Sequence, residues 1–216
     1  MTAPSLSSHW LGSGVPYQDA LERQDALVAA SLAGTAPDTL LLLEHAPVYT
    51  IGRTRDQSSL GDTSHLPHQV VEINRGGQAT YHGPGQLVGY PILNLRHYGK
   101  DLHLYLRLLE DALIATLADF GIAARRRKGL TGVWVGDRKI ASIGVGLRKW
   151  IAMHGFALNV TPACLPAFAA ITPCGIDGVT MTCLHHESAA RPTTREVAEL
   201  TTSHLQSRLA TLPAPT

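Results

Sequence analysis

The sequence predicts an α+β fold in which helices flank a mixed β-sheet core. Residues 16–33 and 101–120 repeat their apolar side chains at the three- and four-residue spacing of helices, and a third such pattern begins near residue 193. Short apolar runs bounded by glycine, proline or asparagine lie between these patterns and indicate strands. Because some runs are close enough to pair as hairpins, a mixed sheet is favoured over a regular strand–helix–strand repeat.

The first half of the chain is expected to form one helix and then several strands. Pro16 suits the first turn of a helix, and Gly34 suits its C-terminal cap. Strands are expected over residues 39–44, 48–51 and 69–73. Another strand is expected over 86–95, and Pro91 within it indicates a sheet edge or a bulge because proline has no N–H to donate.

The second half contains the most regular helical pattern. Asp101 is a good N-cap, and the apolar spacing continues from it to residue 120. Strands are expected over residues 131–135 and 139–144, which form a hairpin, and over 155–160. Thr193 and Glu196 fit a capping box that begins a final helix ending near residue 209.

Length, charge and cysteine content limit the classes of function. The 216 residues, 44% of them hydrophobic, suit one domain with a large core. A formal charge of +1 gives no electrostatic basis for binding nucleic acid or an anionic membrane. The N-terminus has no signal-peptide pattern and no apolar run is as long as a membrane span, so a cytoplasmic protein is expected. Three cysteines form neither a disulfide framework nor a CxxC pair, so no metal site is expected.

The glycine-rich run from Arg75 to Gln86, RGGQATYHGPGQ, is the clearest sign of a functional site. Its four glycines permit positive φ and a close approach of the backbone to a ligand. Tight turns alone would explain the glycines, but they seldom need an arginine, a threonine, a tyrosine and a histidine as well. We therefore expect this run to form one wall of an active site.

Cys174 is the candidate nucleophile. It lies between proline and glycine in a predicted turn, whereas the surroundings of Cys164 and Cys183 are typical of packed residues. A thiol attacks as the thiolate, so Cys174 needs a neighbour that lowers its pKa.

Three side chains are candidate neighbours of this thiol. Lys139 lies within an otherwise apolar strand, and the histidines are His82 and His154. From the residues alone, a Cys/Lys pair and a Cys/His pair are equally open.

Six motifs, in this order, resemble those of the lipoyl(octanoyl) transferases. They are EHAPVYTIG (44–52), RGGQATYHGPGQL (75–87), YPI (90–92), KIASIG (139–144), HGFALN (154–159) and PCG (173–175). The resemblance implies a single catalytic domain over 1–216, with a core of about 10–210 and short flexible termini, related to the biotin and lipoate protein ligase catalytic domains. It also implies transfer of an octanoyl group, without a cofactor, from octanoyl-acyl carrier protein to a lysine of lipoyl domains. The implied acceptors are 2-oxoacid dehydrogenase complexes and the glycine cleavage H protein.

The resemblance also assigns roles to residues. It implies that Cys174 carries the acyl thioester and that Lys139 is the acid/base, with His154 as a possible support. The implied substrate-binding residues are Arg75, Gly76, Gly77, Gln78, Ala79, Thr80, Tyr81, His82, Ser142, Ile143, Gly144, Gly155, Phe156 and Ala157. For an apolar tunnel around the octanoyl chain, the candidates are Leu87, Ile143 and Phe156.

Some alternatives stay open. The basic run Arg125-Arg126-Arg127-Lys128 is typical of a solvated surface turn, but it could instead dock the acidic protein partners that the resemblance implies. An ATP-dependent lipoate or biotin ligase on the same fold would not need a cysteine. A non-catalytic acyl-binding protein would need neither Cys174 nor Lys139 for its activity.

Overall fold

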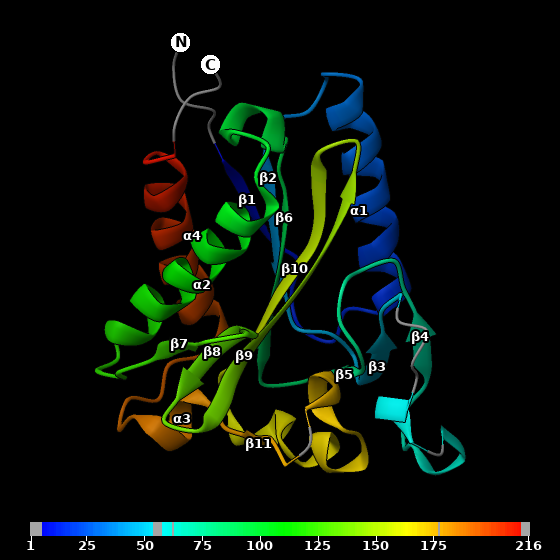
Figure 1. The fold of residues 1–216 in the computed structure, drawn as a ribbon, viewed down its shortest axis with the longest axis vertical. Coiled ribbons are helices and arrows are strands. Elements are labelled where there is room, and N and C mark those ends of the chain that lie inside the picture. The colour runs from blue at the N-terminus through cyan, green and yellow to red at the C-terminus, as the bar shows by residue number, and fades with distance from the viewer. Residues whose placement is uncertain (1–5, 54–57, 62, 177, 213–216) are drawn as a thin grey trace.

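The structure is a computed structural model that describes residues 6–53, 58–61, 63–176 and 178–212, with the backbone alone for Cys174. Within these ranges the main sheet has eight strands (Figure 1). Their spatial order is β1 (Ser7–Trp10), β2 (Thr39–Leu43), β6 (Gln86–Ile92), β10 (Ile151–Asn159), β9 (Arg138–Arg148), β8 (Leu130–Val135) and β7 (Arg125–Arg127), while β11 (Thr180–Met181) pairs with β9. The β1–β2 and β9–β11 pairs are parallel and the others antiparallel, so the predicted mixed sheet is confirmed.

A smaller sheet lies beside the main one, at the right of Figure 1. It consists of β4 (Val70–Glu72), β3 (Val48–Ile51) and β5 (Thr80–His82). The strand β5 lies inside the glycine-rich run, where the sequence indicated no strand. Because β5 pairs with β3, the run is fixed to the small sheet at this point.

Helices cover both faces of the main sheet. Leu40 and Leu42 of β2 pack with α2 (Leu102–Ala118) and α4 (Thr194–Leu209), whereas Leu41 and Leu43 pack on the side of α1 (Tyr17–Leu32). Successive side chains of a strand point to opposite faces, so this alternation places α1 opposite the other two helices. The remaining helical turns are α3 (Leu184–Glu187), η1 (Ser58–Leu60), η2 (Thr63–His65), η3 (Leu95–Tyr98), η4 (Pro162–Cys164), η5 (Pro166–Ala170) and η6 (Pro173–Gly175). None of the helices in the described ranges is long and apolar enough to cross a membrane.

The predicted helix starts are confirmed by their caps. The Asp101 side chain accepts a hydrogen bond from the backbone N–H of Leu104, at 3.0 Å. Thr193 and Glu196 form the expected capping box at the start of α4. Each contact satisfies an N–H that has no partner within its helix.

The prediction that Pro91 marks a sheet edge or bulge is wrong. Pro91 lies in β6, an interior strand, opposite Leu40 of β2. The pairing of β6 with β10 ends at Gly89, and Cδ of Pro91 is directed toward Gly155 of β10. The missing N–H therefore falls on the side of β6 where the ladder has already ended, and proline is tolerated there.

The basic run also differs from its expected form. Arg125–Arg127 is the edge strand β7, with all three side chains exposed, instead of a surface turn. The residues that follow turn into β8 and are close to the candidate site.

Candidate active site

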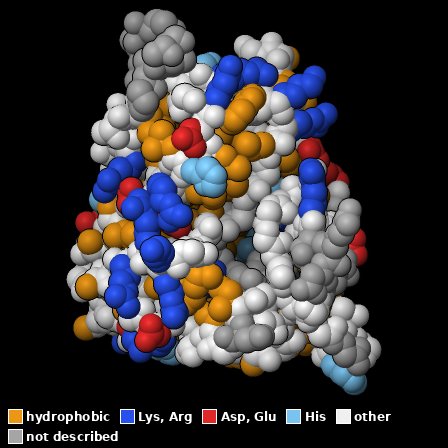
Figure 2. Space-filling view, in the orientation of Figure 1, with side chains coloured by type: hydrophobic (Ala, Val, Ile, Leu, Met, Phe, Trp, Pro, Cys, Tyr) orange, Lys and Arg blue, Asp and Glu red, His pale blue; other side chains and the backbone are white. Residues whose placement is uncertain are grey.

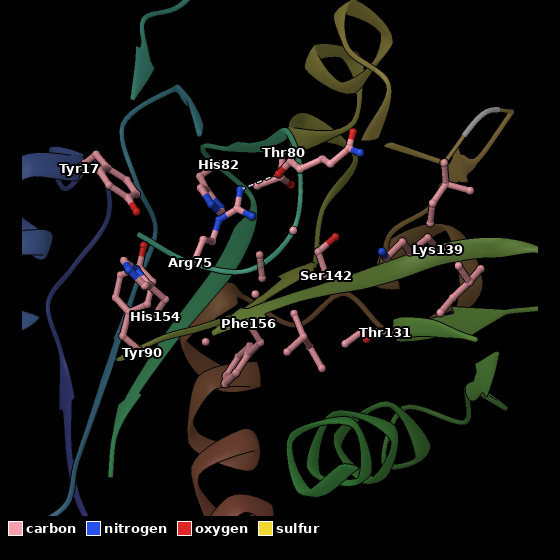
Figure 3. A pocket seen from close by; sticks show the side chains of 18 of the residues that line it. Tyr17, Arg75, Thr80, His82, Tyr90, Thr131, Lys139, Ser142, His154 and Phe156 are labelled. Atoms are coloured by element: carbon pink, nitrogen blue, oxygen red, sulfur yellow. Dashed lines mark hydrogen bonds between the residues drawn. The ribbon is translucent and has the colours of Figure 1, made fainter. Parts of the chain in front are cut away.

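A cavity of about 200 Å³ lies between the main sheet and the glycine-rich run (Figure 3). Lys139 and Thr131 are at one end, Tyr17, Tyr90 and His154 at the other, and Ser142 and Phe156 lie between them. The predicted site residues in its wall are Arg75, Gly77, Gln78, Thr80, His82, Lys139, Ser142, Ile143, Gly144, His154, Gly155, Phe156 and Ala157. The structure thus brings three predicted segments into one cavity.

The pairing of β9 with β10 explains why two of these segments are neighbours. Ser142 is opposite Ala157, Ile143 opposite Phe156, and Gly144 opposite Gly155. The KIASIG and HGFALN motifs therefore lie opposite each other on two antiparallel strands, and residues of both strands line the cavity.

Arg75 organises the glycine-rich run. Its guanidinium donates hydrogen bonds to the carbonyls of Gly76 (2.9 Å), Thr50 (3.1 Å) and Gln78 (3.0 Å), and to Oγ1 of Thr50 (2.9 Å). The side chain is 8% exposed and packs over Gly144, where a Cβ would lie 3.0 Å from Cδ of Arg75. Arg75 therefore closes the loop and places a permanent positive charge in the cavity wall.

His82 is buried in its neutral form. Gln86 donates its amide N–H to Oδ1 of Asn159 (2.9 Å), so its Oε1 accepts from Nδ1 of His82 (2.8 Å). Burial first, and then the neighbouring His45, lower the pKa of His82 to about 3. The Nδ1 atom therefore carries the single proton of this imidazole at neutral pH.

His45 and Tyr90 form a second polar group at the far end of the cavity. Nδ1 of His45 donates to the carbonyl of Val15 (2.9 Å), which leaves Nε2 to accept from the Tyr90 hydroxyl (2.7 Å). Burial lowers the pKa of His45 to about 4 and raises that of Tyr17 to about 12. The far end is thus formed by uncharged polar and aromatic groups, which sequence analysis did not single out.

His154 completes this end. Its backbone is in the left-handed region, with φ of 56°, and its N–H donates to Oε1 of Gln24 (2.8 Å). The residue is 2% exposed, and the backbone of Asn74 lies beside its ring. Burial, followed by the charges of Arg75 and Arg53, lowers its pKa to about 4.

Lys139 is buried at the opposite end. It is 1% exposed, and its Nζ lies 5.4 Å from the centroid of the Trp134 ring. A Cβ on the neighbouring Gly132 would lie 2.8 Å from Cε of Lys139, so glycine leaves room for the lysine side chain. In Figure 3 the lysine amine points toward the cavity.

The segment that carries Cys174 borders the same cavity. Its backbone forms η6, whereas its side chain lies outside the described part of the structure. The next residue, Gly175, packs against the side chain of Gln78, and Ile176 lines the cavity. The other two cysteines are fully buried, and burial raises the pKa of both thiols, which makes Cys164 and Cys183 poor nucleophiles.

Four predicted site residues lie outside the cavity wall. Ala79 and Tyr81 pack into the core of the small sheet, and the N–H of Gly76 donates to the carbonyl of Val145 at 2.9 Å. The expectation that Leu87 lines an acyl tunnel is wrong, because Leu87 is fully buried in the core and is not among the residues that line the cavity. Ile143 and Phe156, the other two tunnel candidates, do line the cavity.

The turn between β7 and β8 and the start of β8 form part of the cavity wall. Gly129, Leu130 and Thr131 line the cavity directly after the basic run. Figure 2 shows Lys and Arg side chains gathered over this side of the molecule, at the left of the view. The cavity wall itself contains Arg75 and Lys139 but, among the described residues, no carboxylate.

Comparison with known proteins gives consistent matches. Residues 16–206 match the family described as the lipoyl protein ligase A/B catalytic domain. An octanoyltransferase of Syntrophotalea carbinolica is 51% identical over 197 residues, which are 91% of this chain and 92% of that protein. Lipoate-protein ligase A bound with ATP has a TM-score of 0.72 at 15% identity, covering 97% of this chain and 86% of the other. Biotin protein ligase from Aquifex aeolicus, in complex with biotin and ATP, has a TM-score of 0.61 at 16% identity, covering 94% and 70%. The predicted α+β fold and its likeness to these ligase domains are confirmed.

Proposed function

This chain belongs to the lipoyl protein ligase A/B catalytic domain family and is an acyltransferase, and we propose that it moves an octanoyl group from octanoyl-acyl carrier protein to a lysine of lipoyl domains. The observation that carries the proposal is a buried lysine at one end of a partly apolar cavity that the Cys174 segment borders. A cysteine and a lysine beside an apolar groove are the groups that covalent acyl transfer needs. An ATP-dependent ligase would not need the cysteine.

The first half-reaction loads the enzyme. The Cys174 thiolate attacks the thioester carbonyl of the donor, and the bond between that carbonyl carbon and the phosphopantetheine sulfur breaks. Lys139 takes the proton from Cys174 before the attack and gives it to the leaving thiol. Backbone amides of the glycine-rich run are candidates to hold the oxyanion, because the run borders the cavity through Gly77 and Gln78.

The second half-reaction transfers the octanoyl group to the acceptor. The amine of the lipoyl-domain lysine attacks the acyl-enzyme, an amide bond forms, and the Cys174 thiolate leaves. Neutral Lys139 takes the proton that the attacking amine loses. Conversion of a thioester to an amide is downhill, so no ATP is consumed. We propose as acceptors the lipoyl domains of 2-oxoacid dehydrogenase complexes and the glycine cleavage H protein.

The cavity supports binding of the alkyl chain. Ile143, Phe156 and Ala157 offer apolar surface along the β9–β10 ladder. Burial of the six methylenes of an octanoyl chain at about 0.8 kcal/mol each contributes roughly 5 kcal/mol. This is enough to make the alkyl chain the main source of donor affinity inside the cavity.

The basic edge of the sheet supports docking of an acidic carrier protein. Arg126 forms ion pairs with Glu110, whose Oε2 lies 3.0 Å from Nε of Arg126, and with Asp111. Arg125, Arg127 and Lys128 are exposed, although Arg127 lies 3.9 Å from the carboxylate of Asp137, and the chain continues from them directly into the cavity wall. We propose that these three side chains meet the acidic surface of the donor.

Intact-mass measurement tests the chemistry. The protein, incubated with octanoyl-acyl carrier protein and no ATP, should gain one octanoyl group, and Cys174→Ser should gain none. Lys139→Met keeps the length of the side chain but removes the amine, and we expect turnover to fall about 10²- to 10⁴-fold. Lys149→Met, which removes an exposed lysine in the hairpin turn, is the matched control and should keep normal turnover. A strict need for ATP, or normal turnover of Lys139→Met, would contradict the proposal.

A further inference from the structure

A second cavity, of about 500 Å³, meets the first at His154. It is formed by α1, the loops after β3 and β4, and the outer ends of β9 and β10. Among the described residues, His154 alone lines both cavities. The two spaces therefore adjoin at this residue.

Packing holds the His154 ring in place. The carboxamide of Gln24 accepts a hydrogen bond from the His154 backbone N–H, which fixes the main chain, and the backbone of Asn74 lies beside the His154 ring. The ring meets Tyr90 edge-on, with centroids 6.4 Å apart. On the neighbouring strand, Gly146 leaves room for the ring, because a Cβ there would lie 3.2 Å from Cδ2 of His154.

The two cavities differ in chemical character. Next to His154, the first is bounded by the aromatic rings of Tyr17 and Tyr90, beyond the apolar stretch at Phe156. The second carries four charged side chains, which are Asp25, Arg53, Glu72 and Arg148. The second cavity also offers apolar side chains, from Leu21, Ile73, Leu147 and Met153, so a longer alkyl chain that passed the His154 ring would find apolar surface there.

We propose that His154 is the end wall of the acyl pocket and sets the longest chain that the enzyme transfers. This inference rests on the proposed function, in which the thioester lies near Lys139 and the alkyl chain extends toward the opposite end of the cavity (Figure 3). The imidazole blocks the passage by its bulk. Chains a few methylenes longer than octanoyl are excluded because they meet the ring.

His154→Gly tests this role. Glycine adopts the observed positive φ without strain, so the change removes the ring and joins the two cavities. We expect the ratio of kcat/KM for dodecanoyl- over octanoyl-carrier protein to rise at least tenfold. Met153→Ala is the matched control, because it enlarges the second cavity and leaves the His154 ring in place, and its ratio should stay within twofold of the unmodified protein. An unchanged ratio in His154→Gly would overturn the proposal.

The experiment separates this inference from the proposed function. If the unmodified protein forms no octanoyl adduct, the proposed function fails, and the chain-length inference fails with it. If it forms the adduct and His154→Gly keeps the same preference, only the end-wall role fails. If a thermal melt shows that His154→Gly is not folded, His154→Asn takes its place. Asparagine tolerates the left-handed backbone and has a shorter side chain than histidine. That variant should load decanoyl at least fivefold better relative to octanoyl, by intact mass from an equimolar mixture, and an unchanged product ratio would overturn the proposal.

Discussion

Replacement of His82 by asparagine should make the stability of the protein less sensitive to acid. His82 is neutral in the folded state, and its Nδ1 donates to Gln86. The amide nitrogen of asparagine occupies nearly the position of Nδ1, so His82→Asn keeps this donor and removes the titrating group. The variant therefore isolates the contribution of one proton-binding site.

The sign and the size of the effect follow from the pKa of His82. The value of about 3 in the folded protein lies below the ordinary 6.5, so the unfolded chain binds the proton first as the pH falls. Stability contributed by the neutral imidazole is complete above pH 6.5 and is lost as the pH falls from 6.5 toward 3. At 1.36 kcal/mol per unit, the 1.5 units between 6.5 and pH 5 correspond to about 2 kcal/mol.

Urea denaturation at pH 7.5 and at pH 5 measures this difference. The unmodified protein should lose about 2 kcal/mol more of its free energy of unfolding between the two pH values than His82→Asn does. His103→Asn is the control, because water reaches this exposed side chain of α2, and its loss should match that of the unmodified protein. Equal losses in His82→Asn and the unmodified protein would show that His82 is not held neutral by burial.

Two further predictions follow from close contacts and from surface charge. Gly155→Ala should lower the free energy of unfolding by about 1–3 kcal/mol in urea denaturation, because the new Cβ would lie 2.2 Å from the carbonyl oxygen of Gly89. Unchanged stability would contradict the tight β6–β10 contact. Lys128→Glu should raise the KM for octanoyl-carrier protein several-fold at low salt and less at high salt, whereas Arg23→Glu, with the same charge change on exposed α1, should leave it unchanged. A similar KM in both variants would exclude docking at the basic run beside the cavity.

Local signals predicted the helices and most strands. The helix caps at Asp101 and Thr193 depend only on residues close to them in the sequence, and so does the apolar spacing within each helix. Both signals are therefore visible in the sequence. The strand β5 was missed because glycines surround it, and only its pairing with β3 defines it. Pro91 was misplaced for a similar reason, since which strand pairs with which is decided by residues distant in the sequence.

The candidate site could be predicted in part. Motif resemblance found the segments that meet in the cavity, because their order and spacing are visible in the sequence. It could not tell which residues of a segment face the cavity, and so Leu87 was placed there although its side chain points into the core. Tyr17 and Tyr90, which line the cavity, were missed because a tyrosine can serve either as a polar site residue or as a packed aromatic residue. Which of the two it is depends on its neighbours in space.

The strand β7 also affects how the protein behaves at high concentration. A sheet edge with free N–H and C=O groups can pair with the edge of another molecule and start aggregation. Here the edge strand carries three exposed arginines, of which Arg126 is paired with Glu110 and Asp111, so two copies meeting along β7 would bring the charges of Arg125 and Arg127 to about 4.8 Å strand spacing. Arg125 and Arg127, which we place at the docking surface, thus also keep the sheet from growing at the β7 edge.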